Sequence, residues 1–264
     1  MTYECLLYEV KDGIATLTLN RPERLNALGG TLRQDLHDAV TRAGADREVR
    51  VMVVTGAGKG FCSGGDVKAM GEAKAGQRER PLLEKIAPGR DRTLLAMREA
   101  PQPIIAAVNG AAAGAGLSFA CACDLRIAAD SASFVPAFIN IGLVPDSGGT
   151  YFIAHLLGYA RAFEWMTSGR KLTAAEAHQW GLVSEVVEAD RLAERAAEVA
   201  AEYAARPTRG VGMTKRLFGQ AFENTLEEQL ELEADLQTAA TRTNDFKEGV
   251  AAFLEKRDPE FSGS

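Results

Sequence analysis

Two glycine-rich elements, each directly after an apolar run, constrain this chain most strongly. The first loop, Gly60-Phe61-Cys62-Ser63-Gly64-Gly65-Asp66, follows residues 51–54, and the second loop, Asn109-Gly110-Ala111-Ala112-Ala113-Gly114-Ala115-Gly116, follows residues 104–108. Small residues at strand ends leave backbone N–H groups open to a ligand oxygen. Two converging N–H groups form an oxyanion hole, which stabilises negative charge on a carbonyl oxygen. The two loops therefore predict a site that polarises a carbonyl group.

Alternating short strand and helix patterns predict an α/β core over residues 1–206. The expected strands are 3–10, 14–19, 51–54, 104–108 and 125–128, with a helix at 115–122. Residues 70–92 are weakly patterned and read as an irregular excursion, after which a helix resumes near 91–99. After Pro207 the pattern is helical throughout, so residues 207–264 form a separate C-terminal helical region. Capping boxes are expected at four helix starts: Thr31/Gln34, Thr173/Glu176, Thr225/Glu228 and Asp245/Glu248.

Charge and composition exclude several classes of protein. The net charge of −6 argues against a nucleic-acid surface. Residues 101–123 carry no charge, but their prolines and glycines divide them into strand, turn and helix, so we expect no membrane span. The N-terminal residues lack a basic leader pattern, which favours a cytoplasmic protein. Four cysteines lack metal-ligand spacing and are expected to be buried thiols: Cys5, Cys62, Cys121 and Cys123.

Motifs in order along nearly the whole chain resemble the signatures of the enoyl-CoA hydratase/isomerase (crotonase) superfamily. Besides the two loops, the matching strings are Leu19-Asn20-Arg21-Pro22, Leu25-Asn26-Ala27, Cys123-Asp124, Gly142-Leu143-Val144-Pro145-Asp146-Ser147-Gly148-Gly149-Thr150, Ala174-Ala175-Glu176-Ala177, Gly181-Leu182-Val183 and Phe253-Leu254-Glu255-Lys256-Arg257. They look most like phenylacetate-pathway oxepin-CoA isomerases and Δ3,Δ2-enoyl-CoA isomerases. The resemblance implies a spiral of repeated strand-strand-helix turns, with a C-terminal helical region that builds a homotrimer or a dimer of trimers.

The same resemblance assigns catalytic roles. It implies that the backbone N–H groups of Gly65 and Ala115 form the oxyanion hole. Typical hydratases of the family use two glutamates, at positions that here hold Ser118 and Phe138. Neither side chain can act as a base at neutral pH. Asp146 matches the catalytic aspartate of some isomerases, and a single carboxylate suffices to move a proton between two carbons.

Asp146 also has a structural interpretation, because Pro145-Asp146-Ser147-Gly148 could open a helix with the aspartate as its N-cap. The two roles are compatible. An apolar setting from Val144, Phe138 and Leu117 would raise the pKa of the carboxyl group into a useful range. Leu117 and Phe138 are also the expected lining of the acyl pocket.

Family positions further imply a binding path for coenzyme A, which enters as part of the substrate. Arg24 and Leu25 would lie near the nucleotide, and the last helix, in relatives often that of a neighbouring subunit, would add Phe253 and Lys256. The first loop would line the adenine and pantetheine path with Ser63, Gly65, Asp66 and Val67. We expect Asp66 mainly to hold this loop through backbone hydrogen bonds. No metal or redox cofactor is implied.

These features together predict an acyl-CoA enzyme that isomerises an unsaturated acyl group through a thioester enolate. Two alternatives stay open. An enoyl-CoA hydratase could manage with one carboxylate and add water to a 2-enoyl-CoA. A catalytically silent protein could use the same pocket only to bind CoA thioesters, although Asp146 and the intact loops argue against this.

Overall fold

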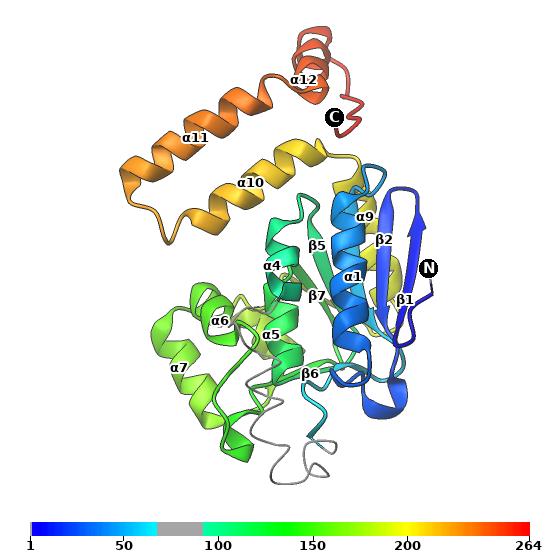
Figure 1. Cartoon of the computed structure of the whole chain (residues 1–264), viewed down its shortest axis with the longest axis vertical. Coiled ribbons are helices and arrows are strands. Elements are labelled where there is room, and N and C mark those ends of the chain that lie inside the picture. Colours follow the sequence, from blue (N-terminus) through cyan, green and yellow to red (C-terminus); the bar gives the residue numbers. More distant parts are fainter. Residues whose placement is uncertain (1, 68–91) are drawn as a thin grey trace.

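A six-stranded sheet forms the centre of the computed structural model, which describes residues 2–67 and 92–264 (Figure 1). Its strand order is β1-β2-β3-β5-β7-β10, antiparallel between β1 and β2 and parallel from β2 onward. The strands are β1 (Leu6–Lys11), β2 (Ile14–Leu19), β3 (Val51–Gly56), β5 (Ile104–Val108), β7 (Leu125–Ala129) and β10 (Glu185–Val187). All five residues of β5 are buried, as expected of a parallel strand covered on both faces.

A second sheet of four short strands receives the chain after β3, β5 and β7. It consists of β4 (Gly60–Cys62), β6 (Ala111–Ala113), β8 (Ser133–Val135) and β9 (Leu172–Thr173). Three successive turns place one strand in each sheet: β3 then β4, β5 then β6, and β7 then β8. This arrangement confirms the predicted spiral. Because β4 pairs with β6, the two glycine-rich loops lie side by side.

Helices enclose the sheets. They are α1 (Leu32–Ala45), α4 (Arg92–Glu99), α5 (Ala115–Ala122), α6 (Gly149–Leu157), α7 (Tyr159–Ser168), α8 (Ala174–Gln179) and α9 (Leu192–Ala204), with short 3-10 turns η1 (Pro22–Arg24) and η2 (Ile139–Ile141). Helix α9 packs on β3, β5 and β7, whereas α1 packs on α4, β1 and β2. Every residue of α5 is buried, and at Gly116 the missing side chain lets the backbone of Cys62 approach closely. The excursion expected at residues 70–92 lies, apart from Arg92, outside the described residues.

The chain after Pro207 forms three helices, α10 (Thr208–Gln220), α11 (Leu226–Ala240) and α12 (Asn244–Glu255). Helix α10 packs on α4, and α11 packs on α10. Figure 1 shows α11 and α12 extending away from the central sheet. The polar face of a helix pair can be solvated, but an apolar face requires a partner.

The uncharged residues 101–123 supply β5, β6 and α5, in agreement with the expected division into strand, turn and helix. Within residues 2–67 and 92–264, none of the helices is both long enough and apolar enough to cross a bilayer.

Two of the four predicted capping boxes are confirmed. In α8, the hydroxyl of Thr173 accepts the N–H of Glu176 at 3.2 Å, and the Glu176 carboxylate accepts the N–H of Thr173 at 2.9 Å. Thr225 and Glu228 make the same reciprocal pair at the start of α11. Each box satisfies two backbone donors that the helix itself leaves without acceptors.

The boxes expected at Thr31 and Asp245 are wrong. The Thr31 hydroxyl donates to the Asp35 carboxylate at 2.8 Å instead of accepting a backbone N–H. Helix α12 begins earlier than expected, and Thr243 is its N-cap, accepting the N–H of Phe246 at 3.0 Å. Side chains that can cap a helix also bond to other partners, so the three-residue spacing alone overpredicts boxes.

Candidate active site

The two glycine-rich loops touch through their backbones. Gly64 has a φ of +85°, and a Cβ built on it would lie 2.6 Å from the Ala113 oxygen and 3.0 Å from the Ala115 nitrogen. Only glycine combines this left-handed backbone with so close an approach. The structure therefore brings Gly65, the next residue along the chain, beside the N-terminus of α5, where Ala115 lies.

Ala115 is the first residue of α5, and Gly114 is its N-cap. Its N–H has no acceptor within the helix, because the first turn of an α-helix leaves its donors free. A Cβ on Gly116 would lie 2.2 Å from the Cys62 oxygen in the first loop. The position of α5 against the first loop thus depends on the missing side chain of Gly116.

Two asparagines hold the first loop in place, and sequence reasoning assigned neither a role. Asn26 is fully buried and donates to the Gly60 oxygen at 2.8 Å and the Ala57 oxygen at 3.0 Å. Asn109 accepts the N–H of Gly56 at 3.1 Å and donates to the Gly60 oxygen at 3.4 Å. Both residues lie within the motif strings of the sequence, so their position was a signal, but their partners are distant along the chain.

Asp66 holds the end of the first loop through an ion pair. Its carboxylate lies 3.4 Å from the Arg21 guanidinium, and both side chains are largely buried. Arg21 also donates to the Ala27 oxygen at 2.7 Å. A structural role for Asp66 was expected through backbone hydrogen bonds, whereas the contact seen here is with a charged side chain.

Asp146 lies in an exposed turn that is tied to α5. The fully buried Ser118 hydroxyl donates to the main-chain oxygen of Asp146 at 2.9 Å. The same oxygen accepts the N–H of Gly149 at 2.9 Å. The N-cap of α6 is Gly148, so the interpretation of Asp146 as a helix cap is wrong. The turn is ordered instead by contacts to its backbone.

Among residues 2–67 and 92–264, the three apolar side chains expected around the Asp146 carboxylate do not enclose it. Asp146 is exposed, and the Val144 side chain is 80% exposed. Leu117 is fully buried in the core, on a different face of α5 from the turn's contact with Ser118. Phe138 is buried, and its ring lies 3.8 Å from a Cβ built on Gly114, directly beside the second loop.

A small cleft joins Ala115 to the turn that carries Asp146. Helices α1, α4 and α5 supply most of its walls, and Ser147 borders it from the turn. Leu117 and Phe138 do not line this cleft, and their place in the acyl pocket stays a prediction. The lining residues are Leu28, Arg33, Leu36, Thr93, Leu94, Ala115, Phe119 and Ser147.

Comparison with known proteins shows the family. A sequence model described as "Enoyl-CoA hydratase/isomerase" matches residues 9–264. The chain belongs to this family. The 1,2-epoxyphenylacetyl-CoA isomerase of Escherichia coli (strain K12) is 41% identical over 270 residues, covering 98% of this chain and 99% of the relative. A protein of Rhodobacter capsulatus named "Probable enoyl-CoA hydratase" is 42% identical over 263 residues, with both chains fully covered.

Solved structures of this enoyl-CoA hydratase/isomerase family share the fold. The crystal structure of an enoyl-CoA hydratase from Bacillus anthracis superposes with a TM-score of 0.91 at 33% identity, covering 99% of this chain and 100% of that one. The family and the spiral fold expected from the motifs are thereby confirmed. The relatives include both isomerase and hydratase names, so family membership alone does not select the reaction.

Three residues expected to contact CoA lie together within one chain of this family member: Arg24, Leu25 and Ser63. The Ser63 hydroxyl donates to the Arg24 oxygen at 3.2 Å, and the Ser63 N–H donates to the Leu25 oxygen at 2.9 Å. Leu25 has a φ of +48° and an exposed side chain. Val67 is exposed at the end of the first loop. The η1 turn and the first loop thus form one continuous, partly open surface.

The other expected CoA contacts lie elsewhere. Phe253 is 82% exposed on α12, and Lys256 ends that helix with a φ of +58°. Figure 1 shows α12 at the opposite end of the molecule from β6, which borders the two loops. Within one chain the structure does not bring Phe253 and Lys256 to Arg24. Their contact with CoA stays a prediction.

The buried thiols are not nucleophiles. Burial raises the pKa of Cys62 and of Cys121 to about 11 and that of Cys123 to about 12. A thiol with such a pKa is protonated at neutral pH, and the thiolate is the reactive form. Together with the free and buried Cys5, they are packing residues, as expected.

Proposed function

We propose that this protein isomerises an unsaturated acyl-CoA, either by moving a double bond or by rearranging an unsaturated ring, through a thioester enolate. The N–H groups of Gly65 and Ala115 hold the thioester oxygen, and Asp146 moves the proton. Support comes from the contact between the two loops and from the cleft that links Ala115 to the Asp146 turn.

The observation that carries this proposal is the hydrogen bond of Ser118. In hydratases of the family this position holds a glutamate, which can activate water. Here the hydroxyl is buried and donates to the main-chain oxygen of Asp146 at 2.9 Å. A hydroxyl held as a donor is no base at neutral pH, and Phe138 at the second glutamate position has no titratable group. Of these three positions, only Asp146 carries a group able to transfer a proton.

The proposed reaction needs one carboxylate. The Asp146 carboxylate takes a proton from C2 of a 3-enoyl thioester, and the electron pair moves onto the thioester oxygen. The two backbone N–H groups stabilise that oxyanion, each contributing about 3 kcal/mol. The carboxylic acid then returns the proton to C4, which leaves the double bond between C2 and C3. Coenzyme A enters and leaves as part of the thioester, and the proposal includes no metal or redox cofactor.

The test compares a 3-enoyl-CoA with crotonyl-CoA in deuterated water, with products followed by mass spectrometry. We expect rapid formation of the 2-enoyl thioester and little hydration. In the D146N variant kcat should fall about 10²–10⁴-fold, the usual contribution of a general base, with little change in KM. The exposed Asp190→Asn provides a charge-matched control that should behave as wild type. Near-normal turnover of D146N would refute the role of Asp146.

The runner-up is hydration, which the 42% identity to the Rhodobacter capsulatus protein favours. Dominant formation of 3-hydroxyacyl-CoA from crotonyl-CoA would put it first. Binding of CoA thioesters without either product would indicate the catalytically silent alternative. The 41% identity to 1,2-epoxyphenylacetyl-CoA isomerase supports including that ring epoxide in the substrate panel.

We further propose a homotrimer or a dimer of trimers. The C-terminal helices and the turn between α10 and α11 expose large apolar side chains, and an apolar surface of this extent is typical of an interface. Such an assembly would also bring Phe253 and Lys256 of one chain to the Arg24 surface of another. Light scattering coupled to size-exclusion chromatography tests it, and a monomer would refute it. The exposed residues are Phe218, Phe222, Leu226, Leu230, Val250, Phe253 and Leu254.

A further inference from the structure

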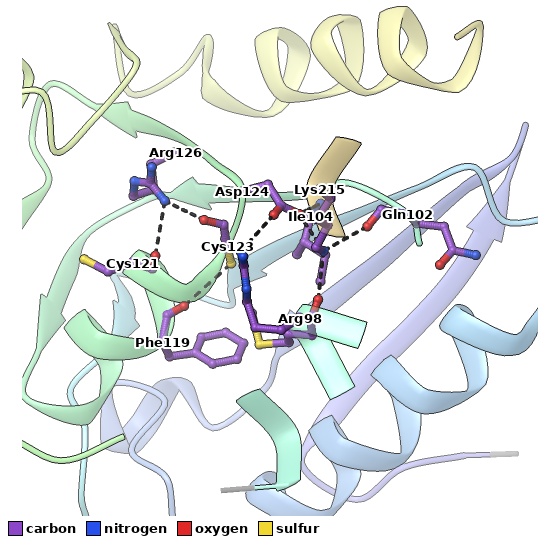
Figure 2. Close-up of polar contacts among 10 residues, drawn as sticks. Arg98, Gln102, Ile104, Phe119, Cys121, Cys123, Asp124, Arg126 and Lys215 are labelled. Carbon is purple, nitrogen blue, oxygen red and sulfur yellow. Dashed lines mark hydrogen bonds and ion pairs between the residues drawn. The ribbon is translucent and has the colours of Figure 1, made fainter. Parts of the chain in front are cut away.

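A buried guanidinium holds the C-terminal end of α5. Arg126, the second residue of β7, donates through Nη1 to the Cys123 oxygen at 2.6 Å and to the Cys121 oxygen at 3.5 Å. Its Nε donates to the Leu182 oxygen at 2.6 Å. Figure 2 shows the guanidinium beside the last turn of α5, with the bonds to Cys121 and Cys123. Arg126 thus bonds both the end of the helix and a separate loop.

This contact suits the electrostatics of a helix end. The last carbonyl groups of an α-helix receive no hydrogen bond from within the helix, and they carry its partial negative charge. A cation that donates to these carbonyls supplies the missing hydrogen bonds and balances the partial negative charge. Hydrogen bonds from a charged donor are also stronger than those between neutral groups. Arg126 is buried, so little water competes for these carbonyls. The bonds therefore stabilise the C-terminal end of the helix.

A second buried cation continues this network toward α4. Asp124, next to Cys123, accepts the Ile104 N–H and the Lys215 ammonium, each at 2.8 Å. Lys215 also donates to the Met97 oxygen at 2.8 Å, in the last turn of α4. These bonds therefore join the C-terminal ends of α4 and α5 to the starts of β5 and β7. The network lies at the opposite end of α5 from the two loops.

The other end of α5 carries the oxyanion donor. The helix has eight residues and is about 12 Å long at 1.5 Å per residue, and all eight residues are buried. At its N-terminus Gly116 is in contact with the Cys62 oxygen. A short, enclosed helix moves as one body, because close-packed interiors transmit displacement. A shift at Cys121 and Cys123 therefore displaces the Ala115 N–H.

We propose that Arg126 is a positioning residue of the oxyanion site. Its guanidinium sets the position of α5 along its axis, and thereby the point at which the Ala115 N–H meets the thioester oxygen. Arg126 itself contacts no reacting atom. This inference rests on the proposed function, because it assumes that Ala115 stabilises an enolate.

The test uses the full-length protein in the variants R126K and R126M. Besides kcat and KM for a 3-enoyl-CoA, it records the absorption spectrum of a bound 2,4-dienoyl-CoA. Hydrogen bonds to the thioester oxygen polarise the conjugated system and shift its absorption to longer wavelength, so the spectrum reports the oxyanion donors directly. Leu17→Ala serves as a control for lost stability, because Leu17 is fully buried in β2, away from α5.

In R126M we expect kcat to fall about 10–100-fold, as for a displacement of up to 1 Å, with KM changed less than about threefold. The red shift of the bound dienoyl thioester should shrink in parallel. R126K keeps the charge but not the fork of donors, so it should give intermediate values. Leu17→Ala should keep the wild-type kcat and red shift below its melting temperature.

Three outcomes would overturn the inference. Wild-type kcat and red shift in both Arg126 variants would show that α5 is positioned without the guanidinium. If R126M does not fold, a wild-type spectrum and kcat in R126K lead to the same conclusion. A red shift lost equally in Leu17→Ala would show that any destabilisation has this effect. By contrast, wild-type protein that neither shifts the spectrum nor isomerises the substrate would refute the proposed function itself.

Discussion

Substitution of Gly116 by alanine is expected to damage catalysis by separating the two loops. A Cβ on Gly116 would lie 2.2 Å from the Cys62 oxygen and 2.8 Å from both the Cys62 carbonyl carbon and Cβ. Two of these atoms are backbone, so no side-chain rotation relieves the clash. Ordinary van der Waals contact begins at 3.4 Å. The first loop and α5 must therefore move apart by about 1 Å.

The displacement occurs next to both proposed oxyanion donors. Misplacing a reacting group by about 1 Å costs roughly 100-fold in rate, so we expect kcat of G116A to fall by about two orders of magnitude. Overpacking of a buried site should also lower the free energy of unfolding by about 1–3 kcal/mol. A protein of this size tolerates that loss without unfolding at 25 °C.

The assay measures kcat and KM for a 3-enoyl-CoA together with urea unfolding. Gly210→Ala in α10 provides the matched control, because its added Cβ would lie 3.6 Å from the nearest atom, Pro207 Cγ. Alanine is also favoured over glycine in a helix by up to about 1 kcal/mol, so this variant should be no less stable than wild type. If G116A keeps more than about a third of the wild-type kcat, the argument from loop separation fails.

Three further changes have defined outcomes. Ser118→Ala removes the donor to the Asp146 oxygen; we expect a loss of about 1 kcal/mol in urea unfolding and a several-fold lower kcat, and an unchanged kcat would show that this bond does not order the turn. Lys215→Met removes the nearer of two cations from the Asp124 carboxylate and leaves it paired with the Arg98 guanidinium at 3.6 Å; we expect the free energy of unfolding to fall by up to about 3 kcal/mol, and a loss below 1 kcal/mol would contradict the cost of breaking a largely buried ion pair. The Glu176 carboxylate accepts hydrogen bonds from the backbone N–H of Thr173, the Arg170 guanidinium and the Thr173 hydroxyl, and these bonds lower the pKa of Glu176 from 4.5 to about 2. Because the folded-state pKa is depressed, the stability advantage of wild type over E176Q should be complete above pH 4.5 and disappear as the pH falls toward 2; thermal melts over this range test it, and a constant difference would refute it.

Local patterns predicted those elements whose causes are local. Continuous apolar runs predicted β3 and β5, and the turn residues Lys11-Asp12-Gly13 between two short strand patterns predicted the hairpin of β1 and β2. Helix α5 was expected at residues 115–122 and lies at Ala115–Ala122. The order of motifs also predicted the family and its spiral fold, which the comparisons confirm.

Contacts between distant segments were predicted poorly. The Thr31 hydroxyl donates to the Asp35 carboxylate. The same carboxylate accepts the N–H of Cys5, which precedes it by 30 residues in the sequence. Apolar side chains were expected to surround Asp146, yet Asp146 is exposed. Its main-chain oxygen is held by the Ser118 hydroxyl from α5. A side chain's bonding capacity is visible in a sequence, but its partner is chosen by packing.

The sequence by itself determined which groups could do chemistry: two loops with open backbone N–H groups, a carboxylate at residue 146, and neither glutamate of a typical hydratase. Only the tertiary structure decided that Gly64 touches Ala115, that Ser118 holds the Asp146 turn, and that Arg126 holds the far end of α5. The physical reason is range. Periodicity and turn chemistry act over a few residues, whereas burial and close packing join residues dozens of positions apart.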